Sequence, residues 1–223
     1  MARDADAPAR AAAEPPGKPA PARIGRPPLT ERRKAATRLE IAHEAVRLFT
    51  ANGVPATSTE EIAAAAGISV RTLWRYFPNK ESCVLPLLTG GMELITRYLR
   101  ARPSGRGAED VLDSLLTEGI GFAVDMPTLL NLVRLTATEP GLRAVWLQAH
   151  HEAEPVFAGL LAERAGLPGP DLATTVQAAM LNSALRAAVE HYALHTDPAA
   201  SDEAGFLQAL RTALRVATHG LLR

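Results

Sequence analysis

Cationic, aromatic and apolar side chains crowd together between residues 70 and 76, in the sequence V-R-T-L-W-R-Y. The guanidinium groups of Arg71 and Arg75 can bond the edge of a guanine, and an apolar group such as Trp74 can meet a thymine methyl group. The hydroxyl of Tyr76 can reach a phosphate. These residue types favour a surface that reads the major groove of DNA. The alternative is a small helical hairpin in which Trp74 and Tyr76 are half buried.

Two short helices joined by a tight turn must position this surface. Ser58 and Glu61 have the spacing of a capping box, which predicts that the first helix begins directly after Ser58. Gly67 supplies the positive φ that a short turn between crossing helices needs, and Ser69 can cap the second helix. The apolar residues at 62, 66, 68, 73 and 77 predict the packed side of the pair. The helix that carries Arg71 therefore has its cationic side free.

At these residues the chain resembles the tetracycline-repressor (TetR) family of transcriptional regulators. The resemblance covers roughly residues 31 to 85 and rests on the segments A-T-S-T at 56–59, I-A at 62–63, G-I-S at 67–69, T-L-W-R-Y-F at 72–77 and P-N-K-E at 78–81. It departs from the family at Trp74, where Tyr or Phe is usual. Residue types and resemblance together predict DNA contacts by Arg26, Thr59, Ser69, Val70, Arg71, Thr72, Trp74, Arg75, Tyr76 and Lys80. Lys80 is expected to bind a phosphate at the start of the next helix.

Formal charge separates along the chain although the total is zero. Residues 23–86 hold ten Lys or Arg against six Glu, whereas residues 87–223 hold eleven Arg against fifteen acidic residues. A basic segment attached to an acidic one is typical of a DNA-binding module on a body that does not touch DNA. We therefore expect a double-stranded DNA operator to be the partner of the basic segment.

Three regions are predicted. Residues 1–28 are rich in Ala and Pro and predict a disordered arm, in which Arg26 of a Gly-Arg-Pro sequence could lie in a minor groove. Residues 29–85 predict a helix-turn-helix DNA-binding domain, whose first helix runs from Thr30 to Asn52. Residues 86–223 predict a helical ligand-binding and dimerisation domain. With no alternating strand pattern, the predicted fold class is all-α.

The predicted helices after residue 80 run over 80–100, 108–125, 127–138, 140–165, 171–195 and 202–222. The last two are apolar over more of their surface than one core needs, which predicts a homodimer with a four-helix interface. The apolar residues concerned are Val176, Met180, Leu181, Leu185, Val189 and Tyr192 in the first, and Phe206, Leu210, Ala213, Leu214, Ala217 and Leu221 in the second. A monomer with a thick core is the alternative.

Residues that could do catalysis or bind metal are sparse. His150 and Glu154 lie one helical turn apart, but two ligands do not make a metal site, and surface or cavity-lining roles are favoured. No phosphate loop, nucleophile elbow or cysteine pair occurs, so we predict no enzyme, no cofactor and no metal. Cys83, in an apolar helical pattern, is expected to be a buried structural thiol. With neither a secretory signal nor a membrane-spanning run, we expect a cytoplasmic protein without a membrane partner.

A weaker resemblance, over about residues 129–192, is to the TetR subgroup whose body is described as an acyl-CoA-like ligand-binding domain. It implies a small apolar or acyl-thioester effector. Leu130, Trp146 and Met180 would line the site of its acyl chain, and its phosphates would face Arg134, Arg143 or Arg186. Each of these arginines could equally be an ordinary surface charge.

Two functions stay open from the sequence. One is a homodimeric repressor that a small apolar ligand, such as an acyl-CoA, releases from a palindromic operator. The other is a DNA-binding protein whose body only dimerises or recruits a protein partner. Loss of DNA binding on addition of a ligand separates them.

Overall fold

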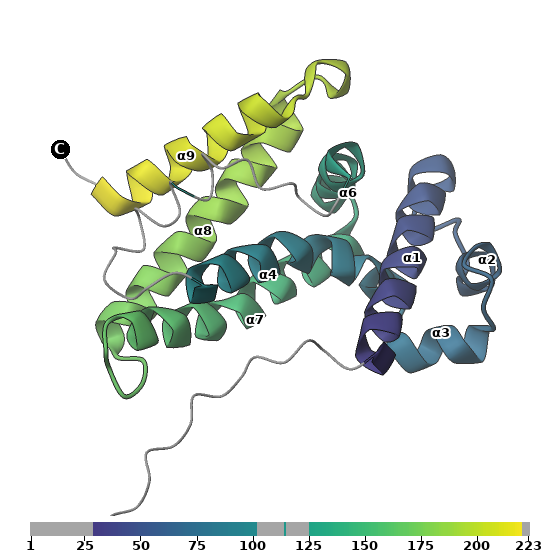
Figure 1. The fold of residues 1–223 in the computed structure, drawn as a ribbon. Coiled ribbons are helices and arrows are strands. Elements are labelled where there is room, and N and C mark those ends of the chain that lie inside the picture. Colours follow the sequence, from purple (N-terminus) through teal and green to yellow (C-terminus); the bar gives the residue numbers. More distant parts are fainter. Residues whose placement is uncertain (1–28, 102–113, 115–124, 220–223) are drawn as a thin grey trace, which may run out of the picture.

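The computed structural model of the chain describes residues 29–101, 114 and 125–219. Every regular element within these ranges is a helix (Figure 1), which confirms the predicted all-α fold. The predicted arm over residues 1–28 and most of the predicted helix over residues 108–125 lie outside the described residues. None of the described helices is long and apolar enough to cross a membrane.

The first four elements form a unit that we call the head. It consists of α1 (Leu29–Asn52), α2 (Thr59–Ala65), α3 (Val70–Tyr76) and the 3₁₀ turn η1 (Glu81–Val84). α1 begins at Leu29, so Thr30 lies inside the helix and is not its N-cap. α1 ends at Asn52, as predicted, and Gly53 follows it with a φ of 82°. Ile41, Ala45 and Phe49 are buried and turn one face of α1 toward the other head helices.

The remaining helices form the body. They are α4 (Leu85–Ala101), α6 (Met126–Thr138), α7 (Pro140–Arg164), α8 (Leu172–His195), the short η2 (Pro198–Ala200) and α9 (Glu203–His219). Asp125 and Asp171 begin α6 and α8 because their carboxylates accept the N–H groups of Thr128 and Thr174. These boundaries agree with the predicted ones to within a few residues.

The prediction of one helix from Lys80 to Arg100 was wrong at its start. Residues 81–84 form the 3₁₀ turn η1, and α4 begins only at Leu85. Pro86 supplies the reason, because it has no N–H to donate to the carbonyl of Ser82 and so cannot continue an α-helix through this point. A proline is tolerated in the first turn of a helix, which is where α4 places Pro86.

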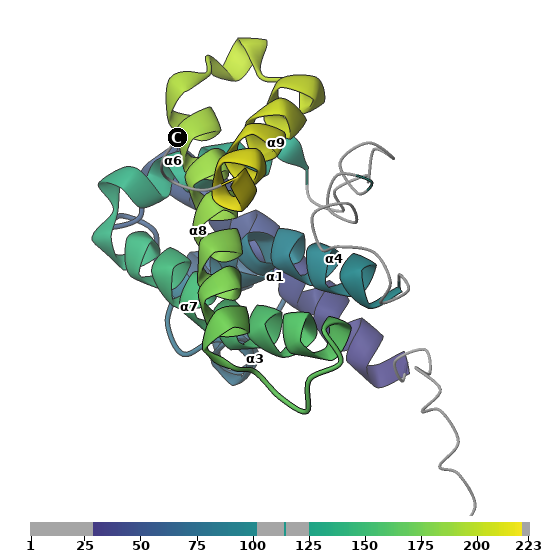
Figure 2. The same ribbon diagram turned by 90° about the vertical axis from the view of Figure 1, so that its left-hand side faces the viewer.

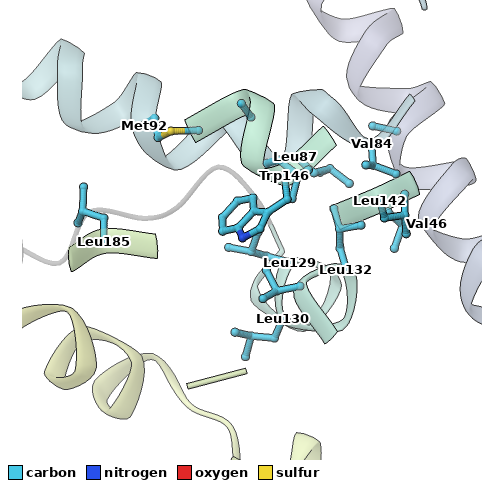
Figure 3. Packing of buried hydrophobic residues seen from close by; sticks show 14 of the residues in the cluster. Val46, Val84, Leu87, Met92, Leu129, Leu130, Leu132, Leu142, Trp146 and Leu185 are labelled. Atoms are coloured by element: carbon cyan, nitrogen blue, oxygen red, sulfur yellow. The ribbon is translucent and has the colours of Figure 1, made fainter. Parts of the chain in front are cut away.

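The head lies at one end of the molecule, and α4 extends from it across the body beside α7 (Figure 1). α8 and α9 lie side by side on the other side of the body in both views (Figures 1 and 2). One hydrophobic cluster runs through both parts, from Ile41 in α1 to Leu214 in α9. Around Trp146, the side chains of Leu87, Leu129 and Leu130 gather from different helices (Figure 3). Head and body thus share a continuous core.

Candidate nucleic-acid interface and ligand cavity

The turn between α2 and α3 is built as its sequence predicts. Ser58 accepts the N–H of Glu61, and the Glu61 carboxylate accepts the Ser58 N–H at 2.7 Å, which completes a capping box. The N–H and the hydroxyl of Ser58 both donate to the Glu61 carboxylate and lower its pKa. Gly67 has a φ of 65°, and Ser69 accepts the N–H of Thr72 to begin α3. The two helices are therefore fixed by local hydrogen bonds on both sides of the turn.

The exposed face of α3 is narrower than the sequence suggested. Leu73 and Phe77 are buried in the core, and Val70 and Tyr76 pack half-buried against it. Arg71, Trp74 and Arg75 are exposed and follow one another at the i, i+3, i+4 spacing of a single helix face. We call these three residues the reading face.

Trp74 is the informative member of the reading face, since 46% of it is exposed to solvent. A large aromatic side chain left in water on a helix of two turns is more typical of a contact surface than of a core. The guanidinium of Arg75 lies over the Tyr76 ring, 5.4 Å from its centroid. Of the other predicted DNA contacts, Thr59, Ser69 and Thr72 lie at the N-terminal ends of α2 and α3, and Arg26 lies outside the described residues.

Lys80 has a structural role that the sequence analysis did not anticipate. Its ammonium donates to the carbonyl of Val54 at 2.7 Å and to that of Thr57 at 2.8 Å. Both carbonyls belong to the loop between α1 and α2, and Thr57 is itself buried and bonds to the Gly53 carbonyl. Lys80 therefore ties this loop to the segment after α3. Only one of its three N–H groups is left for the phosphate contact that we had expected.

Cys83 lies beside this tie and is fully buried, as predicted. Its thiol contacts the Asn79 carbonyl at 3.7 Å. Burial, assisted by the nearby charge of Glu81, raises the pKa of the Cys83 thiol to about 12. A neutral, enclosed thiol of this kind is structural.

An apolar cavity of about 70 Å³ lies inside the body. Within the described ranges it is lined by residues of five helices and is partly open. The lining residues are Leu87, Leu88, Gly91, Met92, Leu94 and Ile95 of α4, Leu129 of α6, Trp146 and His150 of α7, Leu185 and Val189 of α8, and Phe206, Leu207, Leu210 and Leu214 of α9. Figure 3 shows Trp146 between α4 and α6 in the part of the core that borders this space. Ligand sites in proteins usually measure about 300–1,000 Å³. The space between the described helices is smaller than such a site.

Of the six residues predicted to hold a ligand, Trp146 lines the cavity and the others do not. Leu130 is fully buried in the core, and Met180 is 37% exposed on the outside of α8. Arg134 donates to the carbonyls of Ala193 and Thr196. The structure therefore does not bring these four side chains together in this cavity, because sequence alone does not show whether an apolar residue faces the core, the solvent or a cavity, nor which carbonyls an arginine meets.

The remaining two arginines meet at one carboxylate. Glu190 accepts from Arg143 at 2.8 Å and from the indole of Trp146 at 2.6 Å, and it pairs with Arg186 at 3.4 Å. This network holds the Trp146 ring in place against the cavity. Arg143 and Arg186 are thus occupied by a protein carboxylate and do not line the cavity.

His150 is the polar residue of the cavity wall. Its Nδ1 lies 2.7 Å from Oδ1 of Asn182, whose amide nitrogen donates to the His150 carbonyl and to Glu154. The pair His150 and Glu154, considered above as metal ligands, is therefore joined by an asparagine. Among the described residues, no group of three or more His, Cys, Asp or Glu could hold a metal ion.

The outer surface of α8 carries an apolar stripe. Leu172, Val176 and Met180 succeed one another at intervals of four residues and are 80%, 47% and 37% exposed. Other residues that we had assigned to a dimer interface face inward instead: Leu181, Leu185 and Tyr192 of α8 and Phe206, Leu210 and Leu214 of α9 are buried within the chain itself. Periodicity alone could not show which side of a doubly apolar helix the rest of the chain covers.

Comparison with known proteins agrees with this geometry. The family model for bacterial regulatory proteins of the tetR family matches residues 41–87, and the model of the MftR C-terminal domain matches residues 123–222. The HTH-type transcriptional regulator TcmR of Streptomyces glaucescens is 31% identical over 148 residues, which are 63% of this chain and 66% of TcmR. The transcriptional regulator MftR of Mycobacterium tuberculosis is 31% identical over 170 residues, which are 72% of this chain and 82% of MftR.

A solved structure shares the fold. A TetR-family transcriptional regulator from Mesorhizobium loti superposes with a TM-score of 0.55 at 23% sequence identity. The superposition covers 84% of this chain and 97% of that protein. Head and body are therefore arranged as in a solved regulator of this type.

Proposed function

This chain belongs to the TetR family of DNA-binding bacterial transcriptional regulators, and we propose that it is a homodimeric repressor that a small apolar ligand releases from a palindromic operator. The observation that carries the DNA-binding part is the reading face of α3. Arg71, Trp74 and Arg75 are exposed together on a helix whose opposite side is buried. An α-helix fits the major groove, where arginine can bond the O6 and N7 atoms of guanine.

The apolar stripe of α8 supports the homodimer. Leu172, Val176 and Met180 would leave a continuous apolar surface in water unless another chain covered them. A second copy related by a two-fold axis brings an identical stripe. The dimer then presents two copies of α3, which read two half-sites about 34–36 Å apart on one face of the duplex.

The cavity supports control by a ligand. Six of its lining residues belong to α4, which follows η1 without a break. Because the cavity measures about 70 Å³, a ligand must displace part of its wall, and a displacement of α4 passes directly to η1 and the head. A ligand that binds the displaced arrangement more tightly weakens DNA binding by the ratio of its affinities for the two arrangements. This ratio is typically about 5- to 150-fold.

Besides the covalent connection and the shared core, two specific contacts link head and body. The Asn131 side chain of α6 donates to the hydroxyl of Thr50 in α1 at 2.7 Å. At the start of α7, Gly141 lies so close to η1 that an added Cβ would come within 2.9 Å of the Glu81 side chain. We propose that movement of the body helices reaches α3 through these contacts as well as through α4.

The chemistry of the cavity favours a small apolar ligand over a long-chain acyl-CoA. The phosphates of an acyl-CoA need cationic partners, and neither Arg134, Arg143 nor Arg186 lines the cavity. The described part of the cavity wall is apolar apart from His150. The competing function, in which the body recruits a protein partner and binds no ligand, gives no role to an internal cavity.

The experiment is a titration of the protein–DNA complex with small apolar compounds and, separately, with a long-chain acyl-CoA. An effector should release the DNA and raise the melting temperature of the free protein, since it binds the folded state. Gly91→Leu should abolish both effects, because Gly91 lines the cavity, an added Cβ there meets no atom within 4 Å, and the rest of the leucine side chain would occupy the cavity.

Gly159→Leu is the matched control. Gly159 lies in α7, has equally open surroundings and does not line the cavity. This variant should respond like the unmodified protein. If no compound stabilises the protein or releases DNA, the partner-recruiting function replaces the ligand-released one. If the acyl-CoA alone acts and Gly91→Leu leaves its action intact, the effector binds elsewhere than in this cavity.

A further inference from the structure

His150 is a polar residue in the described part of the cavity wall, and its hydrogen bonds define which of its ring nitrogens carries the proton. The side chain is 5% exposed, and its Nε2 atom is buried without a hydrogen-bond partner. Buried polar groups in proteins almost always have a partner, and one without a partner costs about 1–3 kcal/mol. His150 lines the apolar cavity, and its Nε2 lies just behind the cavity surface, so a ligand that opens this part of the wall would supply the missing partner.

The hydrogen bonds around His150 decide whether Nε2 accepts or donates. The amide nitrogen of Asn182 lies 3.0 Å from the His150 carbonyl and 3.1 Å from a carboxylate oxygen of Glu154. Both are acceptors, so the NH₂ group of Asn182 must face them, and its Oδ1 must face the imidazole. Because Oδ1 can only accept, Nδ1 of His150 carries the proton.

The neutral ring then has a bare lone pair on Nε2. Burial lowers the pKa of His150 and keeps the ring neutral, although the Asn182 bond opposes this shift. The ring is also held in place, because it meets the Trp146 ring edge-on with centroids 4.1 Å apart. Trp146 in turn is fixed by its bond to Glu190. Nε2 is thus a preorganised acceptor in an apolar space.

We propose that the ligand of this cavity is an apolar molecule with one hydroxyl group, and that this hydroxyl donates a hydrogen bond to Nε2 of His150. This inference rests on the proposed function, whose ligand class it narrows. A ligand that offers only acceptors, such as an ether, leaves Nε2 without a partner. A ligand that donates satisfies the unpaired Nε2 of His150 and has its own hydroxyl satisfied in return.

The test uses three compounds that share a benzene ring. Phenol can donate a hydrogen bond, toluene has no polar group, and anisole can only accept. Their affinities for the full-length protein at pH 8 come from the rise in melting temperature with concentration. In His150→Phe, the ratio of the phenol dissociation constant to that of toluene should rise about 5- to 150-fold, because the buried hydroxyl loses its acceptor. The ratio of anisole to toluene should not change in this way.

A second measurement needs no variant. The ¹⁵N resonance of the bare Nε2 in the unmodified protein should shift on addition of phenol and stay in place with toluene. If phenol, toluene and anisole bind alike and leave that resonance unmoved, the cavity binds apolar ligands but the donor preference is refuted. If none of the three raises the melting temperature, the cavity is not a ligand site, and the ligand step of the proposed function falls with it.

Discussion

Replacement of Lys80 by methionine should destabilise the head without removing a DNA contact. The ammonium makes hydrogen bonds of 2.7 and 2.8 Å to the carbonyls of Val54 and Thr57, and both bonds are lost in Lys80→Met. A hydrogen bond from a charged group contributes about 1.5–3 kcal/mol. Since Lys80 is only partly buried, water can replace part of this contribution. We expect the free energy of unfolding to fall by about 2–4 kcal/mol in total.

Urea denaturation, followed by tryptophan fluorescence, measures this loss. Lys34→Met is the matched control, because Lys34 makes an exposed ion pair with Glu31 three residues away in the same helix. Exposed pairs contribute about 0–1 kcal/mol, so the control should unfold close to the unmodified protein. The contrast between two identical substitutions isolates the effect of the buried carbonyl partners.

The salt dependence of DNA binding separates structure from phosphate contact. Under conditions where Lys80→Met stays folded, a plot of log affinity against log salt should keep its slope, whereas loss of a phosphate contact would reduce the slope by about 0.9. Unchanged stability together with a reduced slope would refute the structural role of Lys80. That result would restore the phosphate contact expected from the sequence.

Three further predictions concern the reading face, the dimer and the cavity. Arg71→Ala should weaken specific DNA binding by about 1–3 kcal/mol and relax the preference at one base pair in each half-site, as measured with single-base operator variants; an unchanged preference would contradict base contact. Met180→Asp should give folded monomers in analytical ultracentrifugation, whereas Leu147→Asp, at a residue of similar exposure on α7, should leave the dimer intact. If the Met180→Asp protein is still a dimer, the apolar stripe of α8 is not the dimer interface. The pKa of His150 is lower in the folded protein than in the unfolded chain. The contribution of neutral His150 to stability is therefore complete above about pH 6.5 and is lost as the pH falls toward the folded pKa. The loss is at most about 1.4 kcal/mol per pH unit. His150→Gln should flatten this loss in thermal melts between pH 5 and 8, and an unchanged pH profile would show that His150 is not its source.

The sequence predicted those features that are encoded locally. The capping box at Ser58 and Glu61, the turn at Gly67 and the cap at Ser69 depend on neighbours within a few residues, and the structure confirms all three. The α-helical fold follows from periodicity in the same way. The start of α4 was not predicted, although Pro86 in the sequence could have indicated it, and α1 begins one residue earlier than predicted.

Features that depend on distant residues could not be predicted in this way. The carbonyl partners of Lys80 lie 23 and 26 residues earlier in the chain, so the sequence showed a free cation where the structure has an occupied one. Likewise Arg143 and Trp146 meet Glu190 from 47 and 44 residues earlier in the chain, which no spacing in the sequence indicated, whereas the pairing of Glu190 with Arg186 has the ordinary i, i+4 spacing of a helix. His150 was noted for its neighbour Glu154, whereas its partner is Asn182, 32 residues away on another helix.

Selection of binding sites from a pool of random DNA duplexes tests the central claim most directly. A two-fold dimer that reads DNA through the reading face of α3 must enrich inverted repeats whose half-sites lie about one helical turn apart or a multiple of it. A protein in which Arg71, Trp74 and Arg75 are all replaced by alanine should enrich no sequence. Enrichment of a single unrepeated site, or of the same repeat by the triple variant, would contradict the account.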